Sequence, residues 1–155
     1  MDLILWRHAE ALDAGESGED LQRALSKRGE KQALRMARWL DRQLPEGTRI
    51  LCSPARRAEQ TALALGLKYK LRAELAPGSS VEDLLALARW PEGKSSVLVV
   101  GHQPTLGQTI ARLLDLQEQD CAVRKGALWW LRSRRRSPES RIETVVVTVQ
   151  SPETL

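Results

Sequence analysis

Residues 97–102 read Val-Leu-Val-Val-Gly-His, and this stretch decides the class of fold. Four consecutive apolar residues, three of them β-branched, predict a buried strand at Val97–Val100. Pro104 follows almost at once, and proline is well suited to the first turn of a helix, here an amphipathic one that runs to about Leu114. A buried strand that leads directly into a helix is the repeating unit of α/β folds.

The same order of strand and helix recurs toward the N-terminus. Further strands are predicted at Leu3–Trp6, Ile50–Cys52 and, less strongly, Leu71–Leu75. Helices are predicted from Ser26 to about Leu44, from Pro54 to about Leu65 and from Ser80 to Trp90. Two closing strands, Ala127–Leu131 and Glu143–Val149, are joined by a short basic turn and should pair antiparallel. We therefore expect residues 1–155 to form one domain, a three-layer α/β/α sandwich with a mostly parallel sheet and an antiparallel edge.

Composition narrows the class of protein further. The 155 residues carry 24 Lys and Arg against 20 Asp and Glu, a net charge of +4, and the mean hydropathy is −0.37. These values indicate a soluble globular domain. No apolar run could span a bilayer, the start shows no signal peptide, and two cysteines cannot form a disulfide framework. We expect a cytoplasmic monomer without a membrane partner.

Two groups of basic residues stand out. The predicted helix that begins at Ser26 carries a basic stripe opposite its apolar face, made of Arg28, Lys31, Arg35, Arg38 and Arg42. The closing turn carries a second group, made of Arg132, Arg134, Arg135 and Arg136. Both are interpreted as solvated surfaces, and nucleic acid is not expected as a partner. The stripe could steer the docking of an acidic phosphoprotein.

Candidate functional residues follow three of the predicted strands. Arg7-His8 follows the first strand, Ser53-Pro54-Ala55-Arg56-Arg57 the second and Gly101-His102 the fourth. Ligands of open α/β sheets bind at the carboxyl ends of the strands, so both histidines of the chain should meet there. A neutral imidazole is a nucleophile, and guanidinium groups bind phosphoryl oxygens. Nearby arginines should keep the imidazole uncharged, so this edge of the sheet is predicted to be a phosphoryl-transfer site.

These segments resemble the motifs of a known family. Leu5-Trp6-Arg7-His8-Ala9-Glu10 resembles the Arg-His-Gly signature of the histidine phosphatase superfamily, which includes the phosphoglycerate mutases. The stretches 53–62 and 99–104 are similar to its second and third motifs, and Leu25-Ser26-Lys27-Arg28-Gly29 is similar to its helix start. The resemblance spans residues 3 to about 114. The length of the chain and the residues of these motifs are most similar to those of the SixA-type phosphohistidine phosphatases.

The resemblance implies a fold, a reaction and a set of site residues. The fold would be phosphoglycerate mutase-like. His8 would be the nucleophile that is transiently phosphorylated, and Arg7, Arg57 and His102 would hold the phosphoryl group. Arg57 takes the catalytic role rather than Arg56, because the catalytic arginine of the family directly precedes an alanine. The implied activity is hydrolysis of phosphohistidine on a protein of the histidine-phosphotransfer type, without a cofactor or metal.

The chain also departs from the family pattern. Ala9 stands where the signature has glycine. Pro77 stands where the mutase-like branches carry a glutamate that serves as general acid, and the SixA-type branch lacks that acid as well. An alkoxide leaving group needs such an acid, whereas the imidazole of phosphohistidine leaves more easily. Nearby carboxylates that could substitute are those of Glu74, Glu82 and Asp83.

Several alternatives stay open at this point. The protein could be a phosphatase of small phosphate esters, or a non-catalytic module that binds phosphate or a phosphoprotein. A cysteine phosphatase is disfavoured because Cys52 and Arg57 are one residue too close for that motif, and the sequence shows no cluster of metal ligands. The segment Gly15-Glu16-Ser17-Gly18 is interpreted as a flexible loop at the rim of the pocket.

Overall fold

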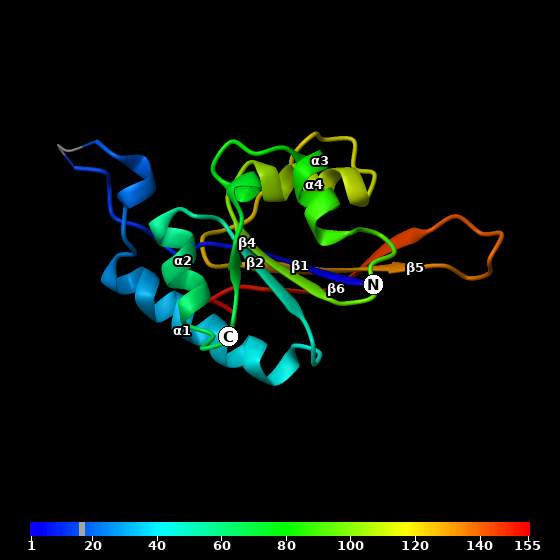
Figure 1. The fold of residues 1–155 in the computed structure, drawn as a ribbon, viewed down its shortest axis with the longest axis horizontal. Helices are drawn as coiled ribbons and strands as arrows, with labels where there is room; N and C mark the ends of the chain where they lie inside the picture. Colours follow the sequence, from blue (N-terminus) through cyan, green and yellow to red (C-terminus); the bar gives the residue numbers. More distant parts are fainter. Residues whose placement is uncertain (16–17) are drawn as a thin grey trace.

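A six-stranded sheet lies between two layers of helices (Figure 1) in the computed structural model, which describes residues 1–15 and 18–155. The strands are β1 (Asp2–Arg7), β2 (Arg49–Cys52), β3 (Lys70–Leu71), β4 (Val97–Gly101), β5 (Leu128–Arg134) and β6 (Glu143–Gln150). The α-helices are α1 (Lys27–Gln43), α2 (Arg56–Leu63), α3 (Val81–Ala88) and α4 (Thr105–Leu113), and short 3₁₀ helices occupy η1 (Asp20–Gln22) and η2 (Ala73–Leu75). Two residues of the predicted rim loop, Glu16 and Ser17, lie outside the described residues.

The sheet is mostly parallel with an antiparallel edge, as predicted. Its order is β3-β2-β4-β1-β5-β6. The first four strands in this order are parallel, and β5 and β6 close the sheet in antiparallel pairing. This order places β1 and β4 side by side in the middle, so the residues that follow them are neighbours at one edge of the sheet.

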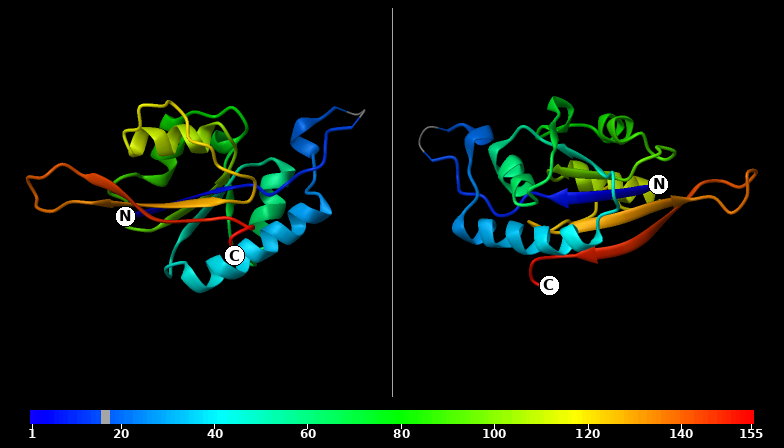
Figure 2. Two further views of the ribbon diagram at one scale, coloured as in Figure 1. Left: turned by 180° about the vertical axis from the view of Figure 1, so that it is seen from behind. Right: turned by 60° about the horizontal axis from the view of Figure 1, so that its bottom comes forward.

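Alternation along β1 divides the core into two layers. Ile4 and Trp6 face α1 and α2, whereas Leu3 and Leu5 face α3 and α4. All four side chains are completely buried. Figure 2 shows the two helix layers from further sides, with the β5–β6 hairpin extending beyond them. The predicted three-layer α/β/α sandwich is therefore confirmed.

Several predicted elements differ in extent from the observed ones, and two of these differences have a local cause. Of the strand predicted at Leu71–Leu75, only Leu71 belongs to β3, because the Arg72 N–H makes the last bond to the sheet, at the Cys52 carbonyl, and Leu75 N–H already turns back to the Arg72 carbonyl. The helix predicted from Pro54 begins at Arg56, since the Ser53 hydroxyl accepts the Ala55 N–H and holds the chain in a tight bend before α2.

The basic residues lie in two different settings. The stripe on α1 is exposed along its whole length, as predicted. The second group does not lie wholly in the turn: Arg132 and Arg134 belong to β5. Its arginines are paired with carboxylates, Arg132 with Asp2, Arg134 and Arg136 with Glu143, and Arg135 with Glu92. Within residues 1–15 and 18–155, no helix has the length and apolar character needed to cross a membrane.

Candidate active site

His8 lies at the carboxyl end of β1 and is held by both neighbouring strands. Its backbone N–H donates to the carbonyl of Gly101, at the end of β4, over 3.1 Å. Its own carbonyl accepts the N–H of Gly126, just before β5, over 3.0 Å. Only 7% of the residue is exposed. Because strands on both sides fix its backbone, the position of the His8 ring is set by the sheet itself.

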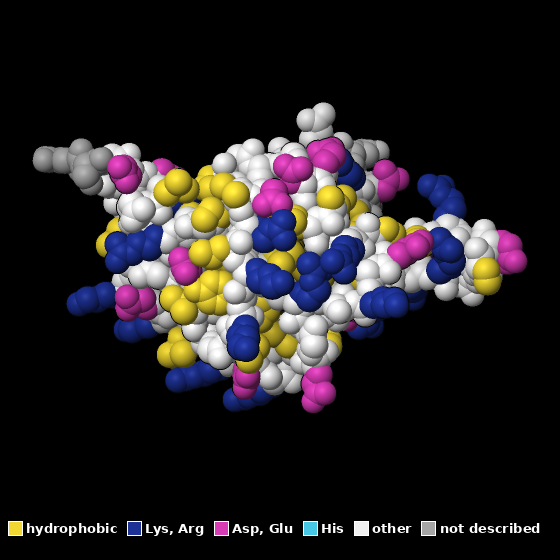
Figure 3. Space-filling view, viewed as in Figure 1, with side chains coloured by type: hydrophobic (Ala, Val, Ile, Leu, Met, Phe, Trp, Pro, Cys, Tyr) yellow, Lys and Arg dark blue, Asp and Glu magenta, His cyan; other side chains and the backbone are white. Residues whose placement is uncertain are grey.

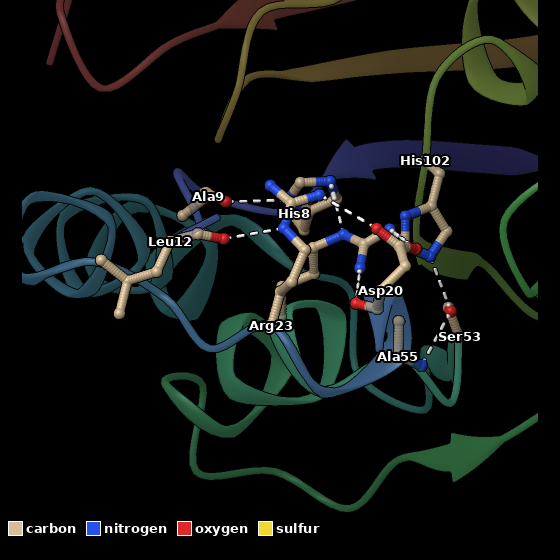
Figure 4. Close-up of polar contacts among 9 residues, drawn as sticks. His8, Ala9, Leu12, Asp20, Arg23, Ser53, Ala55 and His102 are labelled. Carbon is tan, nitrogen blue, oxygen red and sulfur yellow. Dashed lines mark hydrogen bonds and ion pairs between the residues drawn. The ribbon is translucent and has the colours of Figure 1, made fainter. Parts of the chain in front are cut away.

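The His8 ring presents one nitrogen as a free base. Its Nδ1 lies 2.7 Å from the carbonyl oxygen of Ala9, which can only accept, so Nδ1 carries the proton (Figure 4). In the neutral ring, Nε2 then holds the lone pair. The Nε–H of Arg57 points to this lone pair over 3.4 Å. The tautomer of His8 is therefore the one that a nucleophile acting through Nε2 needs.

Arg57 is buried in the first turn of α2, and Arg56 is not. Arg57 is 5% exposed and reaches both His8 and the segment at Asp20. Arg56 is exposed, and its recorded contact is a 3.5 Å bond to the Gln22 carbonyl. The fold therefore brings Arg57 to the site and leaves Arg56 at the surface. The catalytic role of Arg57 stays a prediction.

Arg7 and His102 complete the group of side chains at this edge of the sheet. Arg7 donates from Nη1 to the Val123 carbonyl over 2.8 Å, and its buried Nε has no partner in the described part of the chain. The His102 ring lies with its centroid 5.2 Å from that of His8. All four residues predicted for the site are therefore brought together by the fold.

His102 is oriented by Ser53, a residue that the sequence motifs did not single out for this purpose. The Ser53 hydroxyl accepts the Ala55 N–H over 3.2 Å and lies 2.7 Å from Nε2 of His102 (Figure 4). The hydroxyl also has a proton of its own to donate to Nε2. In that arrangement His102 carries its proton on Nδ1, which is buried and has no partner among the described residues.

Burial keeps both rings uncharged at neutral pH. The pKa of His8 is lowered to about 4: burial is the largest cause, the bond to Ala9 opposes it, and the charges of Arg57, Arg7 and Arg23 add to it. Burial also lowers the pKa of His102 to about 3, with His8 and Arg57 as additional causes. The sequence predicted a neutral nucleophile because of nearby arginines. The prediction of neutrality agrees with the structure, but loss of solvation is the larger cause.

Asp20 is a site residue that sequence analysis missed. Its backbone carbonyl accepts a bond from Arg57 Nη1 over 2.9 Å, and its carboxylate Oδ2 accepts from Arg57 Nη2 over 3.1 Å. The other carboxylate oxygen pairs with Arg23 over 3.1 Å, and Arg23 in turn donates to the Leu12 carbonyl. The local sequence shows only an acidic and a basic residue three positions apart in a polar segment. That pattern is too common to have indicated a site.

The three carboxylates suggested as substitute acids lie elsewhere. Glu74 pairs with Arg72 and Glu82 with Arg112, and both carboxylates are at the surface. Asp83 lies in the first turn of α3, where its N–H donates to the Ser80 hydroxyl. In the described part of the chain, none of these three carboxylates makes a hydrogen bond or an ion pair with His8, Arg57 or His102.

Two further groups bear on the alternatives. Cys52 is completely buried, and burial raises the pKa of its thiol to about 12, so it is not a thiolate nucleophile. Over residues 1–15 and 18–155, no three His, Cys, Asp or Glu side chains are grouped as they would be to hold a metal ion.

The loop after His8 is supported by α1 and α2. Ala9 packs its methyl group against Leu25 and Ala33, and its N–H donates to Thr61. The methyl group that replaces the family glycine therefore lies in an apolar cluster. The sequence motifs contain the residues at the strand ends, whereas the supporting contacts come from Leu25 just before α1, from Ala33 in α1 and from Thr61 in α2.

The comparison with known families agrees with this geometry. The profile of the histidine phosphatase superfamily (branch 1) matches residues 3–78. The phosphohistidine phosphatase SixA of Escherichia coli K12 is 36% identical over 121 residues, which are 73% of this chain and 74% of that protein. The chain therefore belongs to the histidine phosphatase superfamily and is a phosphatase.

Further relatives place it near one group within that superfamily. The SixA homologue of Haemophilus influenzae, also a phosphohistidine phosphatase, is 33% identical over 129 residues, which are 73% of this chain and 77% of that protein. The solved structure of the protein histidine phosphatase SixA with tungstate superposes with a TM-score of 0.80 at 28% identity and covers 99% of both chains. The predicted phosphoglycerate mutase-like fold and the resemblance to SixA-type phosphatases are both confirmed.

Proposed function

We propose that the chain hydrolyses phosphohistidine on proteins through a covalent phosphohistidine intermediate on His8. The observation that carries this proposal is the free Nε2 of His8, which is buried, uncharged and beside the Arg57 guanidinium, while Nδ1 is tied to Ala9. A neutral imidazole fixed in this tautomer is a competent nucleophile toward phosphorus.

In the first step, His8 Nε2 attacks phosphorus and the bond from phosphorus to the substrate imidazole breaks. The electron pair leaves with that ring nitrogen, and because the other ring nitrogen carries a proton, the leaving group is a neutral imidazole. Arg57 and Arg7 would hold the equatorial oxygens, whose charge guanidinium donors stabilise during transfer. With its proton on the unpartnered Nδ1, His102 would be a further donor for one of these oxygens.

In the second step, water attacks the phosphorus of phospho-His8. The bond to Nε2 breaks, its electron pair returns to the ring, and dihydrogen phosphate leaves with both protons of the water. His8 is restored in the tautomer that it had at the start. No metal or cofactor enters either step, because the charge of the phosphoryl group is met by arginines.

Preference for phosphohistidine over alkyl phosphates rests on the lack of a placed acid. Pro77 has no proton to give, and Glu74 and Glu82 are paired with arginines. Hydrogen bonds from Arg23 and Arg57 keep the pKa of Asp20, the carboxylate at the site, below its usual range, so it is ionised. An ionised carboxylate cannot protonate an alkoxide, whereas a neutral imidazole needs no such help.

A protein substrate of acidic character fits the charge of the surface. Lys and Arg side chains gather near the middle of the face in Figure 3. Arg49, Arg72 and Arg89 lie close together. Burial is the largest cause of the lowered pKa of Arg49, and the charges of Arg89 and Arg72 lower it further. With the exposed stripe on α1, these charges would steer a phosphorylated histidine-phosphotransfer protein toward the enzyme.

The test is to incubate the purified chain in EDTA with a phosphorylated histidine-phosphotransfer protein, and separately with alkyl and aryl phosphates. We expect turnover of the phosphoprotein and the aryl phosphate, poor turnover of alkyl phosphates, and acid-labile phosphate trapped on the wild type. His8→Ala should lose both turnover and trapping, and Arg56→Ala, on the same turn as Arg57, should keep both. Equal rates on alkyl phosphates would favour a small-ester phosphatase, and binding without turnover would favour a non-catalytic module. Either outcome contradicts the proposal.

A further inference from the structure

Asp20 binds the end of the Arg57 guanidinium, and its carboxylate lies on Nη2, beside the donor that points to His8. The Nε–H and one Nη2–H of an arginine form a single side of the guanidinium, with two parallel donors that suit the oxygens of a carboxylate or a phosphate. In Arg57, Nε–H points to Nε2 of His8 over 3.4 Å, and Nη2 donates to Oδ2 of Asp20 over 3.1 Å. Nη2, the other nitrogen on the side that faces His8, therefore already binds an anion, while Nη1 donates to the Asp20 carbonyl over 2.9 Å.

A phosphoryl group on its way to His8 needs the same side of Arg57. Its phosphorus must come within bonding distance of Nε2, so its oxygens must lie beside the donor that already points there. The nearest other donor on that side is Nη2, which holds Asp20. A phosphoryl oxygen and the Asp20 carboxylate would be two anions at one nitrogen, so they repel each other and compete for the charge of Arg57.

The Asp20 side chain is able to leave without a large cost. It is 54% exposed, and its other oxygen is paired with Arg23, whose side chain is 26% exposed. Arg23 is itself held by the bond from its Nε to the Leu12 carbonyl (Figure 4). The carboxylate can therefore turn away from Arg57 and keep a counter-ion, and a half-exposed ion pair is weak enough to exchange.

We propose that Asp20 is an internal anion that occupies the phosphate position on Arg57 in the free enzyme and is displaced by the phosphoryl group. It thereby sets the affinity of the site for phosphoryl substrates and for the phosphate product. This inference rests on the proposed function, because it assumes that the pocket receives a phosphoryl group. Its consequence is that orthophosphate, the product, must also compete with Asp20 and is released more readily.

The experiment measures binding of inorganic phosphate by calorimetry and by inhibition of aryl phosphate hydrolysis. It compares the wild type with Asp20→Asn, Asp20→Ala and Glu19→Gln. Glu19 is the matched control, because it is an exposed acid one residue away and makes no side-chain hydrogen bond at the start of η1. We expect phosphate to bind about three- to tenfold more tightly to both Asp20 variants, the effect of removing a weak competing ion pair, and the control to stay within about twofold.

Each outcome has a distinct meaning. Tighter binding is a gain that structural damage would not produce, so it supports displacement of Asp20. Unchanged or weaker binding in the Asp20 variants, with phosphate still bound by the wild type, would overturn the inference and leave the proposed pocket intact. An equal gain in Glu19→Gln would also overturn it, because the effect would then be one of net charge. Absence of phosphate binding in every variant would instead contradict the proposed function.

Discussion

The chemistry of the candidate site depends on where single polar atoms are buried. His8 is neutral mainly because it lies beneath the ends of β1 and β4, and the arginines around it add a smaller effect. Arg57 is near this ring because α2 begins one residue earlier, and its neighbour Arg56 consequently turns to solvent. A shift of one residue along a helix rotates a side chain by about 100°, which is enough to exchange a buried arginine for an exposed one.

The pair Arg57 and Arg56 provides a prediction at this scale. Arg57→Ala should lower kcat/KM for an aryl phosphate, with a loss of about 3 kcal/mol in transition-state stabilisation. This is the size of the effect when a donor to a developing charge is removed. Arg56→Ala should change kcat/KM little, because its guanidinium is exposed and its bond to the Gln22 carbonyl is long, at 3.5 Å. Steady-state kinetics of both variants provide the measurement. The opposite ranking would show that the motif is displaced by one residue from the assignment made here.

At the scale of elements, the start of α1 holds the loop that follows the nucleophile. The Ser26 hydroxyl accepts the Gly29 N–H over 3.0 Å and donates to the Glu10 carboxylate over 2.8 Å. Gly29 packs so closely on Glu10 that an added Cβ would overlap its carbonyl oxygen. The helix start that resembles a family motif is therefore a support for the residues directly after His8.

Gly29→Ala tests this support. The new methyl group would push the first turn of α1 away from the Glu10 backbone, and overpacking of this kind costs about 2 kcal/mol. We expect that loss in the free energy of unfolding, measured with urea, together with reduced turnover. The control is Arg28→Ala, an exposed position on the same turn, which should leave stability within about 0.5 kcal/mol. A Gly29→Ala variant as stable as its control would mean that the close approach to Glu10 is not required.

At the scale of the whole molecule, the two buried histidines make stability depend on pH. Both take up protons near pH 6.5 in the unfolded chain, but only near pH 4 and pH 3 in the folded one. Between these limits the unfolded state binds more protons, so stability falls as the pH falls. Below pH 6.5, each histidine lowers the free energy of unfolding by about 1.4 kcal/mol for every unit that the pH falls.

We therefore expect the free energy of unfolding to drop between pH 7.5 and pH 5.5, as measured by denaturant titration at each pH. His8→Asn should reduce the slope by about half, because one of the two buried imidazoles is removed. A slope that His8→Asn leaves unaltered would show that other groups, and not the buried histidines, cause the acid sensitivity.

The amino-acid sequence by itself determined the order of strands and helices and the residues at the strand ends. These features are local: apolar runs, caps such as Ser26, and motifs whose residues are adjacent in the chain. Tertiary structure alone decided the partners of those residues, since Asp20 reaches Arg57, and Ser53 and Gly126 reach the histidines, only after folding. It also decided that Glu74 and Glu82 lie at the surface with arginines. Contacts between distant segments depend on how helices pack on the sheet, and no local pattern in the chain records that packing.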